Sequence, residues 1–433
     1  MLNNSVKVME PSFVRSFKCA GETCPDHCCH SWKVTVNKKS YKELKKSSNI
    51  IIRQLANDNM ELTRTSVENY AHIKMDDNNN CPFLDENTLC NIHKNCGHQA
   101  LPHTCQEYPR AFNFFGDQVE ASMIMSCPTV TNEVLFNTEA FMFESSSKLI
   151  TDLNNGKIGG LPEDNLPVWF PTIRDFCFNI MLSEGLSFNE RLFIMGMYLK
   201  QAEPHLNNPA KLAQMINSYI SMSEDNTLQN MYKNLPAIPA LKWHIFQHQD
   251  NKFVATTGVK LITDEKDNKN YTVSNSDLRF LACREHLLSA LRDDKDEKNN
   301  KKHSKTDDNN TGEMFDKMLA QANNSLLPEY FDKNPHILVN YILYYLYHHQ
   351  FLLKEHKTPF QFYRIMLVDY FMLTSYLSGI AVNLGELTDE WLAQLFQSYS
   401  RRSQHRINFI EGIEEQLKSA GSESDAAIFS LLK

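Results

Sequence analysis

The sequence predicts a mainly α-helical protein that begins with an irregular, cysteine-rich, metal-binding domain containing a short strand and continues with helical domains. Nine of the eleven cysteines fall between Cys19 and Cys127, and much of the remaining chain carries apolar residues at helical spacing. A Rossmann-type nucleotide fold is not expected, because the chain has no G-x-G turn and no alternation of buried strands with helices. We expect four consecutive segments, at 1–130, 131–292, 293–312 and 313–433.

The first expected segment, residues 1–130, carries the cysteines and has little periodicity. Residues 32–36, WKVTV, alternate apolar and polar side chains, which predicts one short strand. Residues 40–55 have a helical pattern. The polar run 76–80 predicts a turn that leads into Cys81.

The second expected segment, 131–292, is a helical domain. Ser187 and Glu190 have the spacing of a capping box and come just before an apolar helical stripe. Between residues 254 and 277 the pattern gives way to a polar loop with strand character at 271–273. A helix is expected to resume over 278–292.

Residues 293–312 form the clearest boundary, because this stretch has no large apolar side chain and predicts a flexible polar loop or linker. The last segment, 313–433, is expected to be a C-terminal helical domain. Asn334 and Pro335 predict a helix start with proline at the first helical position. Residues 388–390, TDE, predict another, with acidic side chains in its first turn.

The charge pattern and hydropathy exclude two classes of partner. The net charge is −8 and no basic stripe is present, so nucleic acid is not expected as a partner. The apolar stretch 334–353 is too polar to face lipid, and 370–384 is too short to span a membrane. Residues 1–17 lack the apolar core of a signal peptide. We therefore expect a cytoplasmic protein without a membrane partner.

Clustered cysteines in a chain of 433 residues without a secretion signal predict a metal site. Disulfides and incidental buried thiols are the alternatives. The first group reads C-x4-C-x3-C-C, and the chain lacks the paired C-x2-C spacing of structural zinc fingers. This spacing favours an iron–sulfur cluster, with zinc as the alternative metal. The cysteine triad of radical S-adenosylmethionine enzymes is not matched, because its third position is Ser31.

The ordered motifs of the N-terminal part resemble the flagellin lysine N-methylase family, within the broader class of zinc- or iron-chelating cysteine-rich domains. These motifs are EPSFVRSFKC (10–19), CPDHCC (24–29), CPFL (81–84), CNIH (90–93), LPHTCQEYPR (101–110) and SCP (126–128). Near the C-terminus, the pair Asn340-Tyr341 and the segment with Ser400, Arg401 and His405 also match. Gln106 and Cys96 depart from the family pattern.

The resemblance implies a protein-lysine methyltransferase that uses S-adenosylmethionine as methyl donor and flagellin as protein substrate, and that carries a 4Fe-4S cluster. The cluster either clamps the fold or binds the donor. More thiols match than the four that one cluster uses, so a second metal site or supporting thiols are both open. The matching metal-ligand candidates are Cys19, Cys24, Cys28, Cys29, Cys81, Cys90, Cys105 and Cys127.

Candidates for catalysis follow from the chemistry of lysine methylation, which needs a neutral amine and a positioned sulfonium donor. Arg401 and His405 would lie one helical turn apart and could hold a carboxylate, or else brace neighbouring helices. Tyr341 is a candidate aromatic wall for a cation, with packing of the helix bundle as the other interpretation. Tyr108 and Arg110 are candidates to position the cysteines and face an anionic cluster.

A rival interpretation is a non-enzymatic iron- or zinc-binding module, such as a metal sensor, chaperone or electron-transfer protein. The histidines next to the cysteines are spare ligand candidates, namely His27, His30, His93 and His103. Three cysteines lie outside the matched pattern or far along the chain, and we expect them to be dispensable for metal binding, namely Cys96, Cys177 and Cys283.

Overall fold

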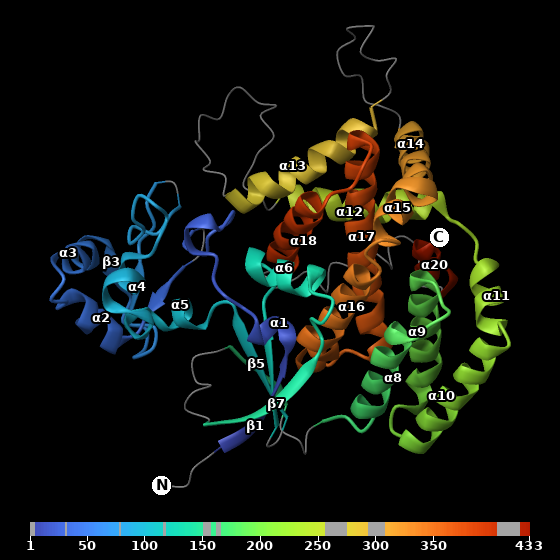
Figure 1. Cartoon of the computed structure of the whole chain (residues 1–433), viewed down its shortest axis with the longest axis horizontal. Helices are drawn as coiled ribbons and strands as arrows, with labels where there is room; N and C mark the ends of the chain where they lie inside the picture. The colour runs from blue at the N-terminus through green and yellow to red at the C-terminus, as the bar shows by residue number, and fades with distance from the viewer. Residues whose placement is uncertain are drawn as a thin grey trace, which may run out of the picture.

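The computed structural model of the chain is mainly helical, as the sequence predicts, and places a small cysteine-bearing lobe beside a larger body (Figure 1). It describes residues 5–30, 33–77, 79–115, 118–149, 157–161, 166–255, 275–292, 308–404 and 425–433. We call residues 18–109 the cysteine lobe and the rest of the described chain the body. The lobe leaves the body after the first strand and helix and returns to it at the next long strand, so it is an insertion.

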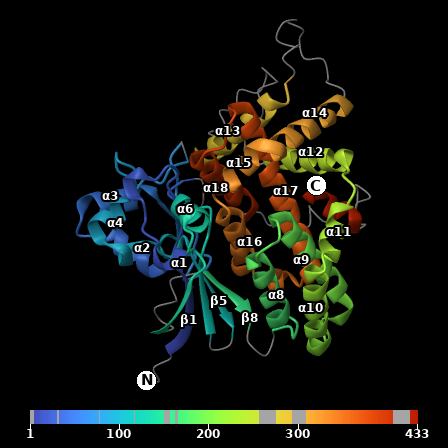
Figure 2. The same ribbon diagram turned by 45° about the vertical axis from the view of Figure 1, so that its right-hand side comes forward.

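A five-stranded sheet forms one side of the body (Figures 1 and 2). Its strands, in spatial order, are β7 (Phe143–Leu149), β1 (Ser5–Pro11), β6 (Gln118–Met123), β5 (Arg110–Phe115) and β8 (Lys157–Leu161). β1 runs parallel to β6, with Val8 opposite Val119, and antiparallel to β7. β5 is antiparallel to β6 and parallel to β8.

This sheet goes beyond the single short strand that the sequence predicts for the N-terminal part. β7 and β8 also lie where only helices are expected. The physical reason is distance along the chain, because Val8 pairs with a residue more than 100 positions later. The alternation of apolar and polar residues in β1 is too short to predict its pairing with a strand that far along the chain.

The cysteine lobe has its own small sheet and its own core. Its elements are β2 (Thr35–Val36), β3 (Met60–Leu62), β4 (Ala71–Ile73), α2 (Lys38–Lys45), α3 (Ile50–Asn59), α4 (Asn91–Cys96) and α5 (His103–Glu107), with 3-10 turns at Gly21–Thr23 (η1) and His98–Ala100 (η2). The strand expected at 32–36 is present at its end, as β2. The single helix expected over 40–55 is two helices, because the Asn49 side chain accepts the backbone N–H groups of Ile51 and Ile52 and starts α3.

Helices make up the rest of the body. They are α1 (Ser12–Arg15), α6 (Pro128–Phe136), α8 (Phe170–Leu182), α9 (Phe188–Ala202), α10 (Pro209–Glu224), α11 (Thr227–Lys233), α12 (Pro239–Ala255), α13 (Asn275–Ala290), α14 (Asp308–Gln321), α15 (Leu327–Phe331), α16 (His336–His349), α17 (Pro359–Leu384), α18 (Asp389–Gln404) and α20 (Asp425–Phe429). A π-helical turn, η5, spans Ala322–Leu326, and 3-10 turns span Glu203–His205 (η4), Gln350–Glu355 (η6) and Ser430–Leu432 (η7).

Several predicted helix starts are confirmed. Ser187 and Glu190 form the expected capping box at the start of α9. α18 begins at Asp389, with two acidic residues in its first turn. α16 begins one residue later than expected, with Pro335 as its N-cap. The capped starts are predictable because the capping interaction is local in sequence.

Two predicted loops fall largely outside the described residues. Residues 256–274 include the expected strand-like segment, and residues 293–307 form most of the expected linker. The last part of that linker, 308–312, is helical, because α14 starts at Asp308. The domain boundaries at 130, 292 and 312 stay predictions.

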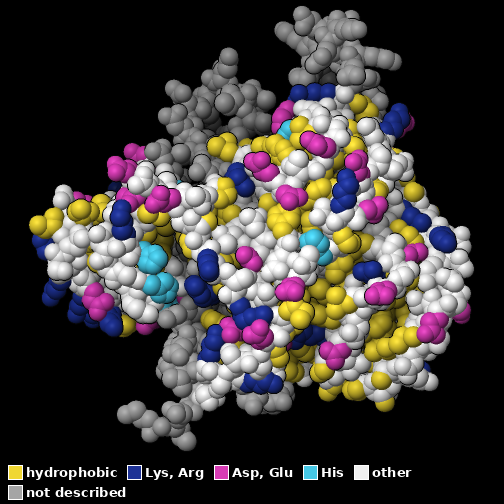
Figure 3. Space-filling model, in the orientation of Figure 1, with side chains coloured by type: hydrophobic (Ala, Val, Ile, Leu, Met, Phe, Trp, Pro, Cys, Tyr) yellow, Lys and Arg dark blue, Asp and Glu magenta, His cyan; other side chains and the backbone are white. Residues whose placement is uncertain are grey.

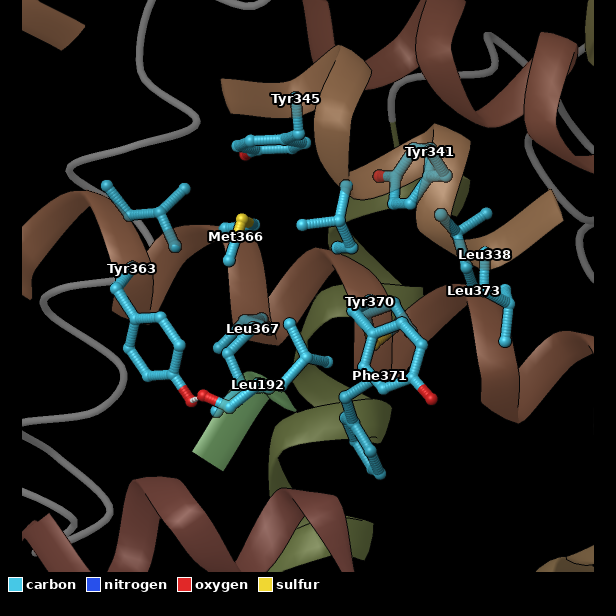
Figure 4. Close-up of a cluster of buried hydrophobic side chains, with 14 of the residues drawn as sticks. Leu192, Leu338, Tyr341, Tyr345, Tyr363, Met366, Leu367, Tyr370, Phe371 and Leu373 are labelled. Atoms are coloured by element: carbon cyan, nitrogen blue, oxygen red, sulfur yellow. Dashed lines mark hydrogen bonds between the residues drawn. The ribbon is translucent and has the colours of Figure 1, made fainter. Parts of the chain in front are cut away.

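One hydrophobic core runs through the body from Phe13 to Leu432 and includes residues of both expected helical domains. Helix α17 lies at its centre, and Figure 4 shows its side chains packed against α9 and α16. The buried Tyr363 hydroxyl donates to the carbonyl oxygen of Leu192 at 2.9 Å. α17 is long and apolar enough to cross a membrane by length and composition, but 89% of its most apolar stretch is buried, which is the burial of a core helix.

Candidate metal centre and its contact with helix α18

Eight of the nine N-terminal cysteines gather where the cysteine lobe meets the body. The loop CPDHCC, residues 24–29, contributes three of them, and the backbone N–H of Cys81 donates to the carbonyl oxygen of Cys29 at 2.8 Å. Cys127 comes from the body, as the N-cap residue of α6. Electrostatic interactions connect Cys28 with Cys24, Cys29, Cys81, Cys90, Cys105 and Cys127, and connect Cys24 with Cys19. These are the eight thiols of the predicted ligand set.

Burial makes several of these thiols hard to ionise. It raises the pKa of Cys81 and of Cys127 to about 12, and it raises the pKa of Cys105 well above its usual range. Cys28 is the exception, because a hydrogen bond from the neighbouring Cys29 thiol lowers its pKa and raises that of Cys29. A bound cation would remove the cost of ionising such thiols, which is how metal binding and thiol deprotonation are coupled.

A buried carboxylate holds the CPDHCC loop against the body. Asp26 is 4% exposed and accepts hydrogen bonds from His30 Nε2 at 2.8 Å and from Gln397 Nε2 of α18 at 2.6 Å. Arg401, one turn further along α18, lies 3.6 Å from Asp26 Oδ2 and 3.2 Å from His30 Nε2. Gln397 also donates to the carbonyl oxygen of Ser126, next to Cys127. Helix α18 therefore contacts both parts of the chain that supply cysteines.

The donor set suits a soft metal, although the side chains do not form a closed cage. Within the described ranges, no three His, Cys, Asp or Glu side chains are close enough together to hold a metal ion as they stand. All eleven cysteines are free thiols, and thiolates select zinc, copper(I) or iron–sulfur clusters. His27 adds an orphaned buried ring nitrogen, Nδ1, in the same loop. The residues present thus fit a thiolate-bound metal by the chemistry of their donor atoms.

The other three histidine candidates either contact a neighbouring side chain or lie nearer the surface. His30 is buried against Asp26 and stands 5.0 Å from the His27 ring, edge to face. His103 pairs with Glu107 at 3.1 Å near the surface. His93 lies in the last turn of α4, with its ring 6.1 Å from that of His98. Their roles as ligands stay predictions.

Of the three predicted catalytic residues, the structure describes Arg401 and Tyr341, and it places them in different surroundings. Arg401 lies at the cysteine cluster, where it lowers the pKa of Cys28. Tyr341 is 4% exposed and packs in the body core against Tyr345 and Phe396, so it does not line an open site (Figure 4). His405 lies outside the described residues.

The two predicted cofactor-binding residues, Tyr108 and Arg110, lie in different surroundings. The Tyr108 hydroxyl is 3.2 Å from Ser126 Oγ and its ring is buried beside Cys127 and Cys28, which raises its pKa well above the usual range. The Arg110 guanidinium instead stands 5.7 Å above the Phe17 ring and lines a cavity of about 330 Å³ at the sheet. The guanidinium that acts on Cys28 is that of Arg401.

Sequence reasoning missed Asp26 and Gln397. Asp26 stands inside the CPDHCC motif, so its place between two cysteines was a signal that could have drawn attention to it. Gln397 carries no local signal, because a glutamine on an amphipathic helix is ordinary. Its role follows only from the docking of α18 onto the lobe.

On the face of the body seen in Figure 3, acidic and basic side chains are interspersed.

Comparisons with known proteins give two family matches. Residues 174–431 match the model of the "FliB lysine N-methylase C-terminal domain". Residues 18–129, which comprise the cysteine lobe, β5, β6 and the start of α6, match the CxxCxxCC model, described as "Putative zinc- or iron-chelating domain". No solved structure matches the chain.

Curated relatives carry names that agree with these family matches. The chain is 39% identical over 136 residues to the "Flagellar biosynthetic protein FliU" of Salmonella muenchen, which covers 31% of this chain and 80% of that protein. It is 28% identical over 221 residues to the "Lysine-N-methylase" of Salmonella typhimurium, and equally to that of Salmonella choleraesuis. These matches cover 51% of this chain and 53% of each enzyme, so the chain spans about half the length of the two methylases.

Proposed function

This chain belongs to the FliB lysine N-methylase family, and from that membership we propose that it is a protein-lysine N-methyltransferase that moves methyl groups from S-adenosylmethionine to lysine side chains of flagellin. The names of the two lysine-N-methylases support the activity, and the flagellar name of FliU supports a flagellar substrate. The observation that carries the proposal is the direct contact between the two matched domains, through Asp26 of the cysteine lobe and α18 of the methylase domain.

We propose further that a subset of the eight clustered cysteines holds an iron–sulfur cluster of the four-iron type, with zinc as the alternative. The clustering of soft thiols supports a metal, and the lack of paired C-x2-C spacing supports iron–sulfur over zinc. When bound, such a cluster cross-links several thiolates and organises a region with a small core. Eleven free thiols also support a reducing, cytoplasmic location.

The chain's own residues act at this centre by positioning. The Asp26 side chain is fully enclosed and accepts hydrogen bonds from His30 and Gln397, so it anchors the cysteine loop. Arg401 is 22% exposed and supplies the cation next to that anchor. The acceptor lysine must lose a proton before it attacks, because its ordinary pKa is about 10.4. A lysine brought against this contact would be desolvated, which favours the neutral amine. Arg401 acts in the same direction, and the enclosed Asp26 carboxylate acts in the opposite one.

The test begins with anaerobic purification and analysis for iron, sulfide and zinc. The holoprotein is then incubated with labelled S-adenosylmethionine and flagellin. We expect brown protein with iron and sulfide, and a gain of ~14 Da in flagellin for each methyl group transferred. Cys28→Ser should lose the metal, while Cys96→Ser, in the exposed cysteine outside the cluster, should keep it.

Two outcomes would contradict the separate parts of the proposal. Colourless protein with stoichiometric zinc would exclude the iron–sulfur cluster and leave the metal site. Metal-loaded protein that adds no mass to flagellin and transfers no label to any lysine would exclude the methyltransferase.

A further inference from the structure

A second cavity, of about 350 Å³, is lined by residues of the body. Several of the helices that supply them, such as α14 and α15, lie on the side of the body turned away from the cysteine lobe (Figure 1). Its walls come from α9, α11, α12, α14, η5, α15, α16, α17 and the C-terminal turn η7. This volume is at the lower end of the range for small-molecule sites. One wall is a π-helical turn, a local departure from α-helix that is frequent at functional sites.

The unusual residue of this cavity is Lys242 of α12, a buried charged side chain. It is 4% exposed, lines the cavity, and makes no ion pair or hydrogen bond within the described chain. The other buried charged side chains of the described residues each have a partner. Asp26 has His30, Glu120 has Arg174, Asp250 has Arg284, Asp369 has two tyrosines, and Arg402 has Asp277.

Burying an ammonium without a partner is unfavourable because the charge loses its hydration. Such a charge persists only where another interaction offsets that loss of free energy. Asp316 of α14 attracts Lys242 from beyond ion-pair distance, but burial is the larger influence and lowers the pKa of the lysine. Among the described residues that line the cavity, Lys242 is therefore the buried cation without an ion-pair or hydrogen-bond partner, while Lys433 donates to the carbonyl oxygen of Lys233. An anionic group of a ligand is the partner that this arrangement lacks.

Hydroxyl groups that line the same cavity offer hydrogen-bond acceptors. Thr374, Ser375 and Ser378 donate their hydroxyl protons to carbonyl oxygens of their own helix, α17. Their oxygen lone pairs remain available on the face that lines the cavity. Asp332, an exposed acid that follows α15, also lines it. These groups suit a donor of positive charge, such as an ammonium.

We propose that this cavity binds a small zwitterion with an α-amino-acid group, whose carboxylate pairs with Lys242 and whose ammonium is held by the α17 hydroxyls and Asp332. A buried lysine without a partner and an acid on the same cavity match a ligand with one charge of each sign. A phosphate dianion is disfavoured, because Asp332 would repel it and Lys433 is already bonded to the carbonyl oxygen of Lys233. Phe331, Phe371 and Leu319 provide apolar walls for the remainder of the ligand.

Two sources carry this chemistry, the methyl donor itself and a free amino acid. The probes are S-adenosylhomocysteine, L-methionine and L-lysine, with 5′-methylthioadenosine as the matched compound without the amino-acid group. Binding is measured by calorimetry on the full-length protein with its metal as purified. Tighter binding of S-adenosylhomocysteine than of the free amino acids assigns the cavity to the donor, and the reverse assigns it to a free amino acid.

Lys242→Met should weaken the binding of the preferred probe roughly tenfold or more, because a charge-assisted hydrogen bond is lost. Lys242→Arg should keep part of the affinity. Lys317→Met, on the exposed surface of α14, should bind like the wild type. Without ligand, Lys242→Met should melt no lower than the wild type, because it replaces an unpaired buried charge by an apolar side chain.

Three outcomes would overturn the inference. The first is no binding of any amino-acid probe to the wild type at millimolar concentration. The second is equal binding of 5′-methylthioadenosine, or an affinity that Lys242→Met leaves unchanged. The third is a large fall in the melting temperature of ligand-free Lys242→Met, which would make the lysine structural. None of these measurements requires methyl transfer, so the inference stands or falls separately from the proposed function.

Discussion

At the scale of the residue, thiols of the same type occupy three different settings. Cys96 is exposed at the end of α4, Cys177 and Cys283 are fully buried in the body core, and the other eight share the cluster.

We expect Cys96→Ser to change neither metal content nor stability. Cys177→Ala and Cys283→Ala should each lower the free energy of unfolding by about 1 kcal/mol, from lost packing, and leave the metal content unchanged. Metal analysis with urea unfolding checks both. Loss of metal in Cys96→Ser would show that the ligand set is wrong.

A second prediction at this scale concerns Asp369, a fully buried carboxyl on α17. Burial raises its pKa to about 6, although the hydroxyls of Tyr345 and Tyr399 donate to it at 2.6 and 2.7 Å. The folded protein therefore keeps this proton over a pH range in which the unfolded chain has lost it. Stability from this group is fully present below pH ~4 and falls as pH rises to ~6, by about 3 kcal/mol in all.

Asp369→Asn should remove this slope, because an amide does not titrate and still accepts a hydrogen bond. The measurement is the free energy of unfolding at several pH values between 4 and 7, for the wild type and the variant. The difference between the two should change across that range and be constant above it. A difference that does not vary with pH would contradict the assignment.

At the scale of the element, α18 connects the cysteine loop to the body. Arg401→Ala and Gln397→Leu remove two of its contacts with Asp26, and we expect both to lower metal retention and methyl transfer more than the melting temperature. Arg292→Ala, at an exposed ion pair with Glu285, is the matched control and should behave like the wild type. Losses of activity and stability in proportion would make α18 a purely structural brace.

Another element-scale prediction concerns the crossing of α13 and α17. A Cβ atom at Gly379 would lie 2.5 Å from the Cα of Leu287, so only glycine allows the two helices to approach this closely. Gly379→Ala should push them apart and lower the free energy of unfolding by about 1–3 kcal/mol. Thermal unfolding measures this. Gly385→Ala, where the backbone has φ 82° but nothing stands near the added atom, reports the cost of backbone strain alone.

Elements that depend on short-range signals could be predicted, and those that depend on distant partners could not. The capping box of α9 and the start of α18 lie within a few residues of sequence. The sheet depends on β1 meeting β6 across the whole inserted lobe. The same division holds at the site. The cysteine series marks the cluster, but the contact of Gln397 with Asp26 joins residues 371 positions apart and leaves no local pattern.

At the scale of the whole molecule, the two cores differ greatly in size. The lobe's core is small and has several cysteines at its edge, whereas the body's core runs almost the length of the chain. Removal of the metal by a chelator should therefore loosen the lobe and leave the body folded. Hydrogen exchange followed by mass spectrometry should show faster exchange in residues 34–105 and little change in α9, α16 and α17. Equal loosening of both parts would mean that the metal stabilises the whole fold.

The inserted position of the lobe also has a consequence for the order of folding. β1 is made early in synthesis, yet its parallel neighbour β6 follows only after the entire lobe. While the lobe is unstructured, joining the two strands means closing a loop of about 100 residues, and the entropy lost grows with that length. A lobe that has already folded around its metal brings its two ends to a fixed separation and removes most of that entropy cost. We therefore expect metal supply during synthesis to set how quickly β1 pairs with β6, and a chain without metal to leave an edge of β6 open to other chains for longer.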